Sequence, residues 1–283
     1  MTNEQKTKAR AALLRYVNNF DTPAQAAASL YGVSVSTLSL LRNNNCESLS
    51  DELWIHIAHQ VGCVDTEWKP ADTGAYLLLR ILCADAQHYR MTYGIAIATG
   101  LGKTFTAHHY TRENADTFYI AGNEYYNRKS FMAALLHSAG QKAKGTVPEM
   151  MQQFADFIRE RDEPLFILDD AHKLKDRVLH QAVILANSVA GCAGIVIMGD
   201  DRLRTRILDG VNEKRIGYDE IYKSIGRRFI SLGSLGPHDV DLVCRANNLT
   251  DEDLIAAIKD ECNNNLHLAT RLINQAAHYK IAA

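Results

Sequence analysis

The sequence lacks the features that mark several classes of protein. Its 283 residues include only 5 Pro and 17 Gly, which excludes collagen-like and low-complexity chains. No run approaches the roughly 18 consecutive apolar residues of a membrane span, and the polar N-terminus, MTNEQKTKARAALLRY, has no apolar signal region. We therefore expect a cytoplasmic protein that has no membrane partner.

Cysteine is also sparse and scattered. No C-x-x-C pair occurs among the six cysteines, which are Cys46, Cys63, Cys83, Cys192, Cys244 and Cys262. In a chain of this length and composition we expect reduced, packed thiols rather than disulfides or a zinc site.

The overall charge balance excludes little. Hydrophobic residues make up 47% of the chain and charged residues 23%, as in globular proteins, and the length suits two or three modules. The formal net charge of −2 gives no argument for nucleic-acid binding, but a polyanion binder needs only a local basic surface. Charge must therefore be considered segment by segment.

Residues 1–64 contain only the patterns of short helices, and we assign them to a helix-turn-helix domain. Within residues 22–44, Ala28 is small where two helices would cross, and Gly32 suits a tight turn with positive φ. The second helix has an apolar stripe, formed by Val35, Leu38 and Leu41. Its other face carries polar groups suited to a DNA groove, among them Ser36, Thr37 and Arg42. A helical hairpin for protein contacts is the alternative, because basic and acidic residues balance here.

The pattern changes after residues 65–73, a polar stretch that we interpret as a linker. A helix is expected from Gly74 to about Arg90, and short apolar runs then alternate with helical stretches, at residues 94–98, 117–121, 165–168, 194–198 and 228–232. Such runs indicate an α/β core over residues 74–236, with a five-stranded parallel sheet covered by helices on both faces. Only helices are expected in residues 237–283, a small C-terminal helical lid.

The first predicted strand runs directly into a phosphate-binding loop. The residues that we expect to hold ATP are Thr99, Gly100, Leu101, Gly102, Lys103, Thr104 and Phe105. In such loops the glycines let backbone N–H groups close around phosphates, the lysine reaches the β and γ oxygens, and the threonine hydroxyl ligates Mg²⁺. The usual first glycine of the motif would fall at position 97, where this chain has Ile97. The G-x-G-K-T core between a strand and a helix nevertheless predicts an ATP site.

Two aspartates follow the third predicted strand, in LFILDDAHKL. We expect Asp169 to hold Mg²⁺ together with Thr104, and Asp170 to polarise the attacking water. Aspartate is one methylene shorter than the glutamate that many such ATPases have at the second place, so we expect slow hydrolysis. Asp200, after the fourth strand, is a candidate sensor of the γ-phosphate, and a solvated turn is the alternative reading of this residue.

The order of these motifs resembles that of the phage Mu B family of transposition proteins and, more distantly, the TnsC- and IstB-type AAA+ partners of transposases. The resemblance extends from about Thr22 to about Ala277 and rests on the helix-turn-helix, the phosphate loop, LDDAHKL, IVIMGDDRL, IYKSIGRRFISLGSLGPHDV and the short lid. It implies an AAA+ ATPase that is stimulated by DNA and uses ATP and Mg²⁺. It further implies self-association into a helical oligomer on double-stranded DNA and recruitment of a cognate transposase.

The resemblance also implies roles for residues outside the ATP motifs. In the lid, His267 stands where the family has a phosphate-sensing arginine, with Arg271 one turn further on. Arg228 is the candidate for an arginine that bridges subunits, and Lys223 and Arg227 are the alternatives. Contacts with the DNA backbone are expected from loops after the second strand, at Tyr125, Asn127, Arg128, Lys129, Lys142 and Lys144.

Two other functions stay open at this point. The ATP motifs also suit a helicase or a helicase loader, although the residues after Pro237 are too few for a second RecA-like lobe. A helix-turn-helix ATPase that regulates transcription, without a filament on DNA, is the third interpretation.

Overall fold

The computed structural model describes residues 3–17, 20, 22–30, 32–43, 49–60, 68–231, 233 and 235–282, and it divides the chain into two units, Met1–Trp68 and Lys69–Ala283. Each unit has a hydrophobic core of its own. The predicted end of the helix-turn-helix domain at residue 64 and the first part of the predicted linker, residues 65–67, lie outside the described residues. Within the described ranges, no helix is long and apolar enough to cross a membrane.

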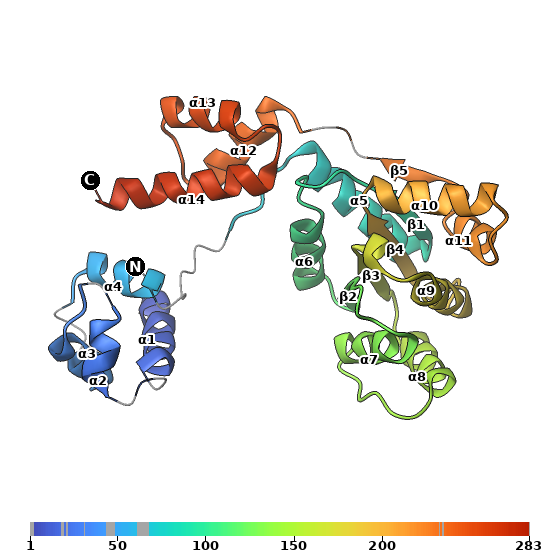
Figure 1. Ribbon diagram of the computed structural model, residues 1–283, viewed down its shortest axis with the longest axis horizontal. Coiled ribbons are helices and arrows are strands. Elements are labelled where there is room, and N and C mark those ends of the chain that lie inside the picture. Colours follow the sequence, from blue (N-terminus) through green and yellow to red (C-terminus); the bar gives the residue numbers. More distant parts are fainter. Residues whose placement is uncertain are drawn as a thin grey trace. The chain divides into compact units, whose positions relative to one another are not determined.

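The first unit consists of short helices around one core (Figure 1). A capping box between Thr22 and Gln25 starts α2, and the Ser34 hydroxyl starts α3 by accepting a hydrogen bond from the Thr37 amide. Gly32 lies between these helices with a φ of +70°, as expected for the predicted tight turn. The helices are α1 (Asn3–Val17), α2 (Pro23–Ala28), α3 (Val35–Arg42) and α4 (Asp51–Gln60).

Two details of the predicted packing in this unit are wrong. Ala28 is exposed, whereas Ala26 and Ala27 are buried. In a run of three alanines composition cannot tell which one faces the core, since each residue turns the helix by about 100°. Val35 is 49% exposed at the first position of α3, so the buried stripe of this helix consists of Leu38 and Leu41.

The second unit is built on a parallel sheet with the strand order β2-β3-β4-β1-β5. Every residue of β3 and β4 is buried, which explains the uninterrupted apolar sequence of these central strands. The strands are β1 (Thr92–Ala96), β2 (Thr117–Ala121), β3 (Leu165–Asp169), β4 (Gly194–Gly199) and β5 (Phe229–Ser231), and all pairs are parallel. The predicted five-stranded α/β core is confirmed.

The direction of each crossover decides which face of the sheet its helices cover. From β1 the chain runs through α6 to β2 at one edge, and all later crossovers lead back in the opposite direction. Because parallel crossovers are right-handed, opposite directions place helices on opposite faces. Thus α5 (Gly74–Tyr89) and α6 (Lys103–Glu113) pack together on one face, and the other face carries α7 (Arg128–Ser138), α8 (Val147–Arg159), η1 (Ala171–Lys173), α9 (Asp176–Ser188), α10 (Asp201–Asn212) and α11 (Tyr218–Ser224) (Figure 1).

The C-terminal part is helical, as predicted, with α12 (Pro237–Ala246), α13 (Glu252–Glu261) and α14 (Leu266–Ala282). Two polar side chains of this lid bind the segment that leads into α5. The Gly74 amide donates to the Asp239 carboxylate at 3.1 Å, and the Lys69 amide donates to the side-chain oxygen of Asn247 at 3.0 Å. The lid is therefore attached to the beginning of the second unit as well as to its end.

Candidate nucleotide-binding site

Three strand ends meet at one edge of the sheet. The loop that carries Gly100 and Lys103 follows β1, Asp169 ends β3, and Asp200 follows β4. Because β4 lies between β1 and β3, and parallel strands share one carboxyl edge, these residues come together although they are far apart in the sequence.

Two glycines determine the shape of the loop after β1. Gly100 and Gly102 have φ values of +84° and +82°, in the left-handed region that favours glycine. Gly102 precedes α6, so the N-terminus of this helix faces the loop. The residue at position 97 needs no such freedom, because the Ile97 amide extends the sheet by donating to the Gly199 carbonyl at 2.9 Å. Ile97 is 1% exposed, so a buried apolar residue fits where the usual motif has glycine.

Lys103 is held inside this loop by neutral partners. Its amino group donates to the carbonyls of Ile97 at 2.8 Å and Ala98 at 3.0 Å, and the residue is 8% exposed. Burial lowers the pKa of Lys103, and the nearby charges of Asp169 and Asp170 oppose this shift. No carboxylate in the described part of the chain lies within ion-pair distance of this amino group, so its charge is available to an anion.

Asp169 and Thr104 form a pair of oxygen ligands suited to Mg²⁺. The Thr104 hydroxyl donates to Oδ2 of Asp169 at 2.6 Å, and Asp169 is fully buried. The same Oδ2 accepts a hydrogen bond from the Tyr119 hydroxyl at 3.1 Å, and burial and this carboxylate together raise the pKa of Tyr119. Sequence reasoning missed Tyr119, because only the pairing of β2 with β3 brings it to the acid.

Asp170 lies at the start of the turn after β3. Its φ of +51° is unusual for a residue with a side chain, and its Oδ2 forms an ion pair with the Lys173 amino group at 2.5 Å. The backbone is tightly constrained here, since a Cβ on Gly122 would lie 2.4 Å from the Asp170 carbonyl oxygen. Asp170 thus projects from the edge of the sheet beside the loop, where the sequence predicted the water-polarising group.

Asp200 lies at the same edge but is engaged by its own helix. Its carboxylate accepts hydrogen bonds from the Arg202 amide at 3.0 Å and from Nε of Arg202 at 2.8 Å. Burial opposes ionisation, yet the hydrogen bonds from Arg202 and the nearby His172 keep the pKa of Asp200 below its usual value. His172 Nε2 lies 3.6 Å from Oδ2 of Asp200, and burial lowers the pKa of this histidine. Asp200 therefore couples α10 to the turn after β3.

The lid reaches the loop through residues that the sequence did not suggest. The Leu266 amide donates to the Gly100 carbonyl at 2.8 Å, and a Cβ on Gly100 would lie only 2.5 Å from Oδ1 of Asn265. Asn265 caps α14, because its Oδ1 accepts hydrogen bonds from the amides of His267 and Leu268. His267, the predicted phosphate contact, is exposed and lies two residues after Asn265.

Arg228 lies at the opposite edge of the sheet from these residues. It immediately precedes β5, so it is at the amino end of the parallel strands. Lys223 and Arg227 each form an ion pair with Asp219, whereas Arg228 is exposed and has no described acidic group within ion-pair distance. The structure therefore does not bring Arg228 together with Lys103, Asp169 and Asp170 within one chain.

The site agrees with what the comparison with known families finds. The family model described as AAA domain matches residues 95–207, from β1 into α10. This segment is an AAA-type ATPase domain. No curated protein matches the chain in a sequence search. The positive φ values of the loop, the free charge of Lys103 and the Thr104–Asp169 pair fit a nucleotide with its magnesium ion.

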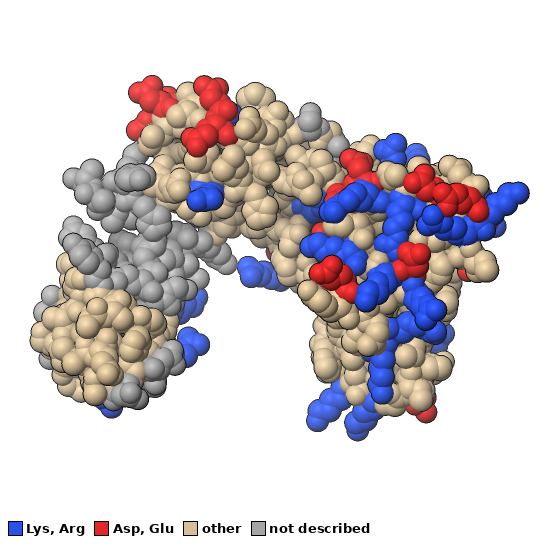
Figure 2. Space-filling model, viewed as in Figure 1, with Lys and Arg blue, Asp and Glu red and all other residues tan. Residues whose placement is uncertain are grey.

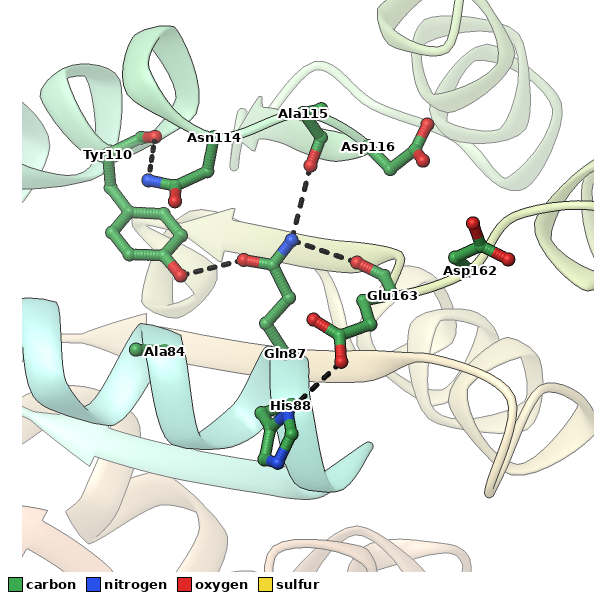
Figure 3. Close-up of a pocket in the computed structure, with 9 residues that line it drawn as sticks. All are labelled: Ala84, Gln87, His88, Tyr110, Asn114, Ala115, Asp116, Asp162 and Glu163. Atoms are coloured by element: carbon green, nitrogen blue, oxygen red, sulfur yellow. Dashed lines mark hydrogen bonds and ion pairs between the residues drawn. The ribbon is translucent and has the colours of Figure 1, made fainter.

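A hollow of about 430 Å³ lies at the amino ends of the strands, among residues that precede β1, β2 and β3. Figure 3 shows Gln87 at its centre, accepting a hydrogen bond from the Tyr110 hydroxyl at 2.7 Å. The Gln87 side-chain amide also donates to the main-chain carbonyls of Ala115 and Glu163. These bonds join α5 to the starts of two strands, so we assign this hollow a structural role.

A basic groove lies beside the AAA-type site, and it has a volume of about 890 Å³. It is lined by residues at the N-terminal ends of α7, α8 and α9, and the helix dipole gives such ends a partial positive charge. Its charged residues are Arg128, Lys129, Lys175, Asp176 and Arg177. Asp176 pairs with Arg206 of α10, so the groove keeps an excess of positive charge. Figure 2 shows Lys and Arg side chains gathered on the face over α7 and α9.

The predicted DNA contacts have different environments. Arg128 and Lys129 line the groove, Tyr125 is 81% exposed, and the Asn127 side chain caps α7. The exposed Lys142 and Lys144 belong to the α7–α8 connection and do not line the groove, whereas the lining residues Lys175 and Arg177 were not predicted. In the first unit, the hydroxyls of Ser36 and Thr37 hydrogen-bond to Ser34 at the start of α3, and Arg42 is exposed at its end.

Proposed function

We propose that this protein binds double-stranded DNA through backbone phosphates when ATP is bound, assembles into an oligomer on that DNA, and recruits and stimulates a transposase. The basic groove supports the DNA-binding part of the proposal, because the two chain segments that form its walls follow strands that end at the nucleotide site. One wall follows β2 through Gly122, whose amide donates to the Asp169 carbonyl at 2.7 Å. The other wall runs from Asp170 through η1 to Lys175.

The chemistry of the groove favours phosphates over bases. Arg128, Lys129, Lys175 and Arg177 supply cations, and the positive ends of three helix dipoles add to the attraction for phosphates. Contacts of this kind carry little sequence information, so the expected binding is strongly dependent on salt and weakly dependent on sequence. The first unit, with Ser36, Thr37 and Arg42, adds a further DNA contact in this proposal.

Hydrolysis of ATP would use the residues at the carboxyl edge of the sheet. Lys103 would exchange its carbonyl partners for phosphate oxygens, and Thr104 and Asp169 would hold magnesium, which would supply positive charge to those oxygens. Asp170 orients the attacking water and accepts its proton. Because its carboxylate is shorter than that of glutamate, we expect slow turnover, with a DNA-dependent increase.

Assembly would complete this site. Arg228 lies at the edge of the sheet opposite to the ATP-binding residues, so in this proposal it acts on the ATP of a neighbouring subunit. In such an assembly, the surface that carries Arg228 on one copy contacts the surface that carries the ATP site on the next copy. This contact can be repeated without closing a ring if each copy is related to the next by a helical rotation. One kind of heterologous contact is therefore enough to build a filament.

The test is electron microscopy of the full chain with ATP, with and without duplex DNA. Continuous filaments on DNA support the proposal, closed hexamers favour the helicase-loader alternative, and discrete monomers favour a transcription regulator. ATP turnover of a transposase-free sample, with two unrelated duplexes, separates ATPase activity from partner recruitment. Transposase stimulation is then measured with the cognate enzyme in a strand-transfer assay.

A further inference from the structure

The ion pair between Lys173 and Asp170 occupies the carboxylate that hydrolysis needs. The Lys173 amino group lies 2.5 Å from Oδ2 of Asp170, and the lysine side chain is about half exposed while that of the acid is largely covered. A carboxylate oxygen that the lysine holds in this way is not available to accept a proton from water.

Lys173 also stands at the beginning of one wall of the basic groove. It ends η1, the buried Leu174 follows, and Lys175 then lines the groove at the start of α9. Arg206 holds this stretch in place, because its guanidinium donates to the Leu174 carbonyl at 2.7 Å and pairs with Asp176. The backbone beneath Lys173 is thus fixed, and its exposed side chain is the part that can move.

We propose that Lys173 restrains Asp170 in the absence of DNA, and that a backbone phosphate in the groove draws Lys173 away and frees Asp170 for hydrolysis. The proposal rests on the proposed DNA-binding function and assigns the means by which DNA regulates the ATP site. One lysine then has two mutually exclusive partners, the Asp170 carboxylate and a DNA phosphate. An ion pair that is partly exposed to water is weak enough to be broken by such competition, and its release accounts for about a two- to fivefold rise in turnover.

The experiment compares Lys173→Gln and Lys173→Arg with the wild type, all as the full chain. Arg159→Gln is the matched control, because Arg159 forms an exposed i,i+3 ion pair with Asp156 on α8. Two quantities are measured for each protein: ATP turnover without and with duplex DNA, and the salt dependence of duplex binding in the presence of a non-hydrolysable ATP analogue.

We expect Lys173→Gln to raise DNA-free turnover about two- to fivefold, with little change in KM for ATP, and to reduce the stimulation by DNA by the same factor. Its log–log salt slope should fall by about one, since one phosphate contact is lost. Lys173→Arg retains the charge and should behave like the wild type, as should Arg159→Gln.

Other outcomes overturn the inference in identifiable ways. Unchanged or lower DNA-free turnover in a folded Lys173→Gln protein means that Lys173 does not restrain Asp170. An unchanged salt slope means that the lysine does not contact phosphate. If the wild type itself fails to bind duplex DNA, the proposed function fails, whereas wild-type binding and stimulation with no effect of Lys173→Gln defeats only this inference.

Discussion

Replacing Gly100 with alanine tests whether the lid is seated on the phosphate loop. An alanine with the φ of +84° found at this position costs about 1–2 kcal/mol of backbone free energy. Its Cβ would also lie 2.5 Å from Oδ1 of Asn265, so the cap of α14 must move. Loss of such a cap costs about 1 kcal/mol. We therefore expect Gly100→Ala to lower the free energy of unfolding by about 2–3 kcal/mol.

Gly102→Ala is the matched control for this change. Gly102 has nearly the same φ, +82°, but the atom nearest to its added Cβ, Cδ1 of Leu266, is 3.6 Å away, an ordinary contact. This variant should lose only the backbone share, about 1–2 kcal/mol. Urea unfolding followed by circular dichroism measures both changes, and hydrogen exchange in the first turn of α14 should rise only in Gly100→Ala.

A double-mutant cycle with Asn265→Ala isolates the contact itself. Once the Asn265 side chain is shortened, Gly100→Ala should cost about 1 kcal/mol less than it does in the wild type, because the displaced cap is already absent. Equal destabilisation by the two glycine variants, or strict additivity in the cycle, would refute the argument that α14 is seated on the loop.

Four further predictions concern the site and the lid. Lys103→Ala should abolish ATP-dependent assembly, and unchanged ATP affinity, measured by calorimetry, would contradict the assignment of the loop. Asp170→Asn should still bind ATP and DNA but lose most turnover, and its DNA complexes should last longer in dissociation assays; wild-type turnover would mean that another group polarises the water. Alanine at Arg128, Lys129, Lys175 or Arg177 should each lower the log–log slope of DNA affinity against salt by about one, on two unrelated duplexes. Changes at Ser36, Thr37 or Arg42 should leave ATP-dependent assembly intact. If these three changes abolish ATP-dependent binding while the groove changes do not, the first unit is the main DNA-binding part. In the lid, hydrogen bonds from Arg245 and Lys259 lower the pKa of Asp241 to about 2. The ionised Asp241 therefore stabilises the fold fully above about pH 4, and this stabilisation is lost as the pH falls towards 2. The difference in Tm between the wild type and Asp241→Asn should disappear over that range.

Sequence reasoning succeeded where the cause is local. Uniformly apolar runs of strand length predict buried parallel strands, because a strand covered on both faces has no polar side. Gly32 predicts a tight turn with positive φ, since glycine adopts that conformation at little cost. Asp169 and Asp170 come directly after the third apolar run, so the sequence places them at the end of a strand. These features depend on neighbours a few residues away, so the sequence by itself determined them.

Only the tertiary structure decided what the strand order and the crossovers bring together. Tyr119 reaches Asp169 because β2 pairs with β3, and Lys175 joins Arg128 because the starts of α7 and α9 line one groove. Asn265 and Leu266, at the start of α14, contact Gly100 of the phosphate loop because the lid packs on that loop. Arg228 falls at the edge opposite to the ATP site because β5 is parallel to β1. Each of these outcomes depends on pairing between segments far apart in the chain, and spacing along the sequence carries no information about such pairing.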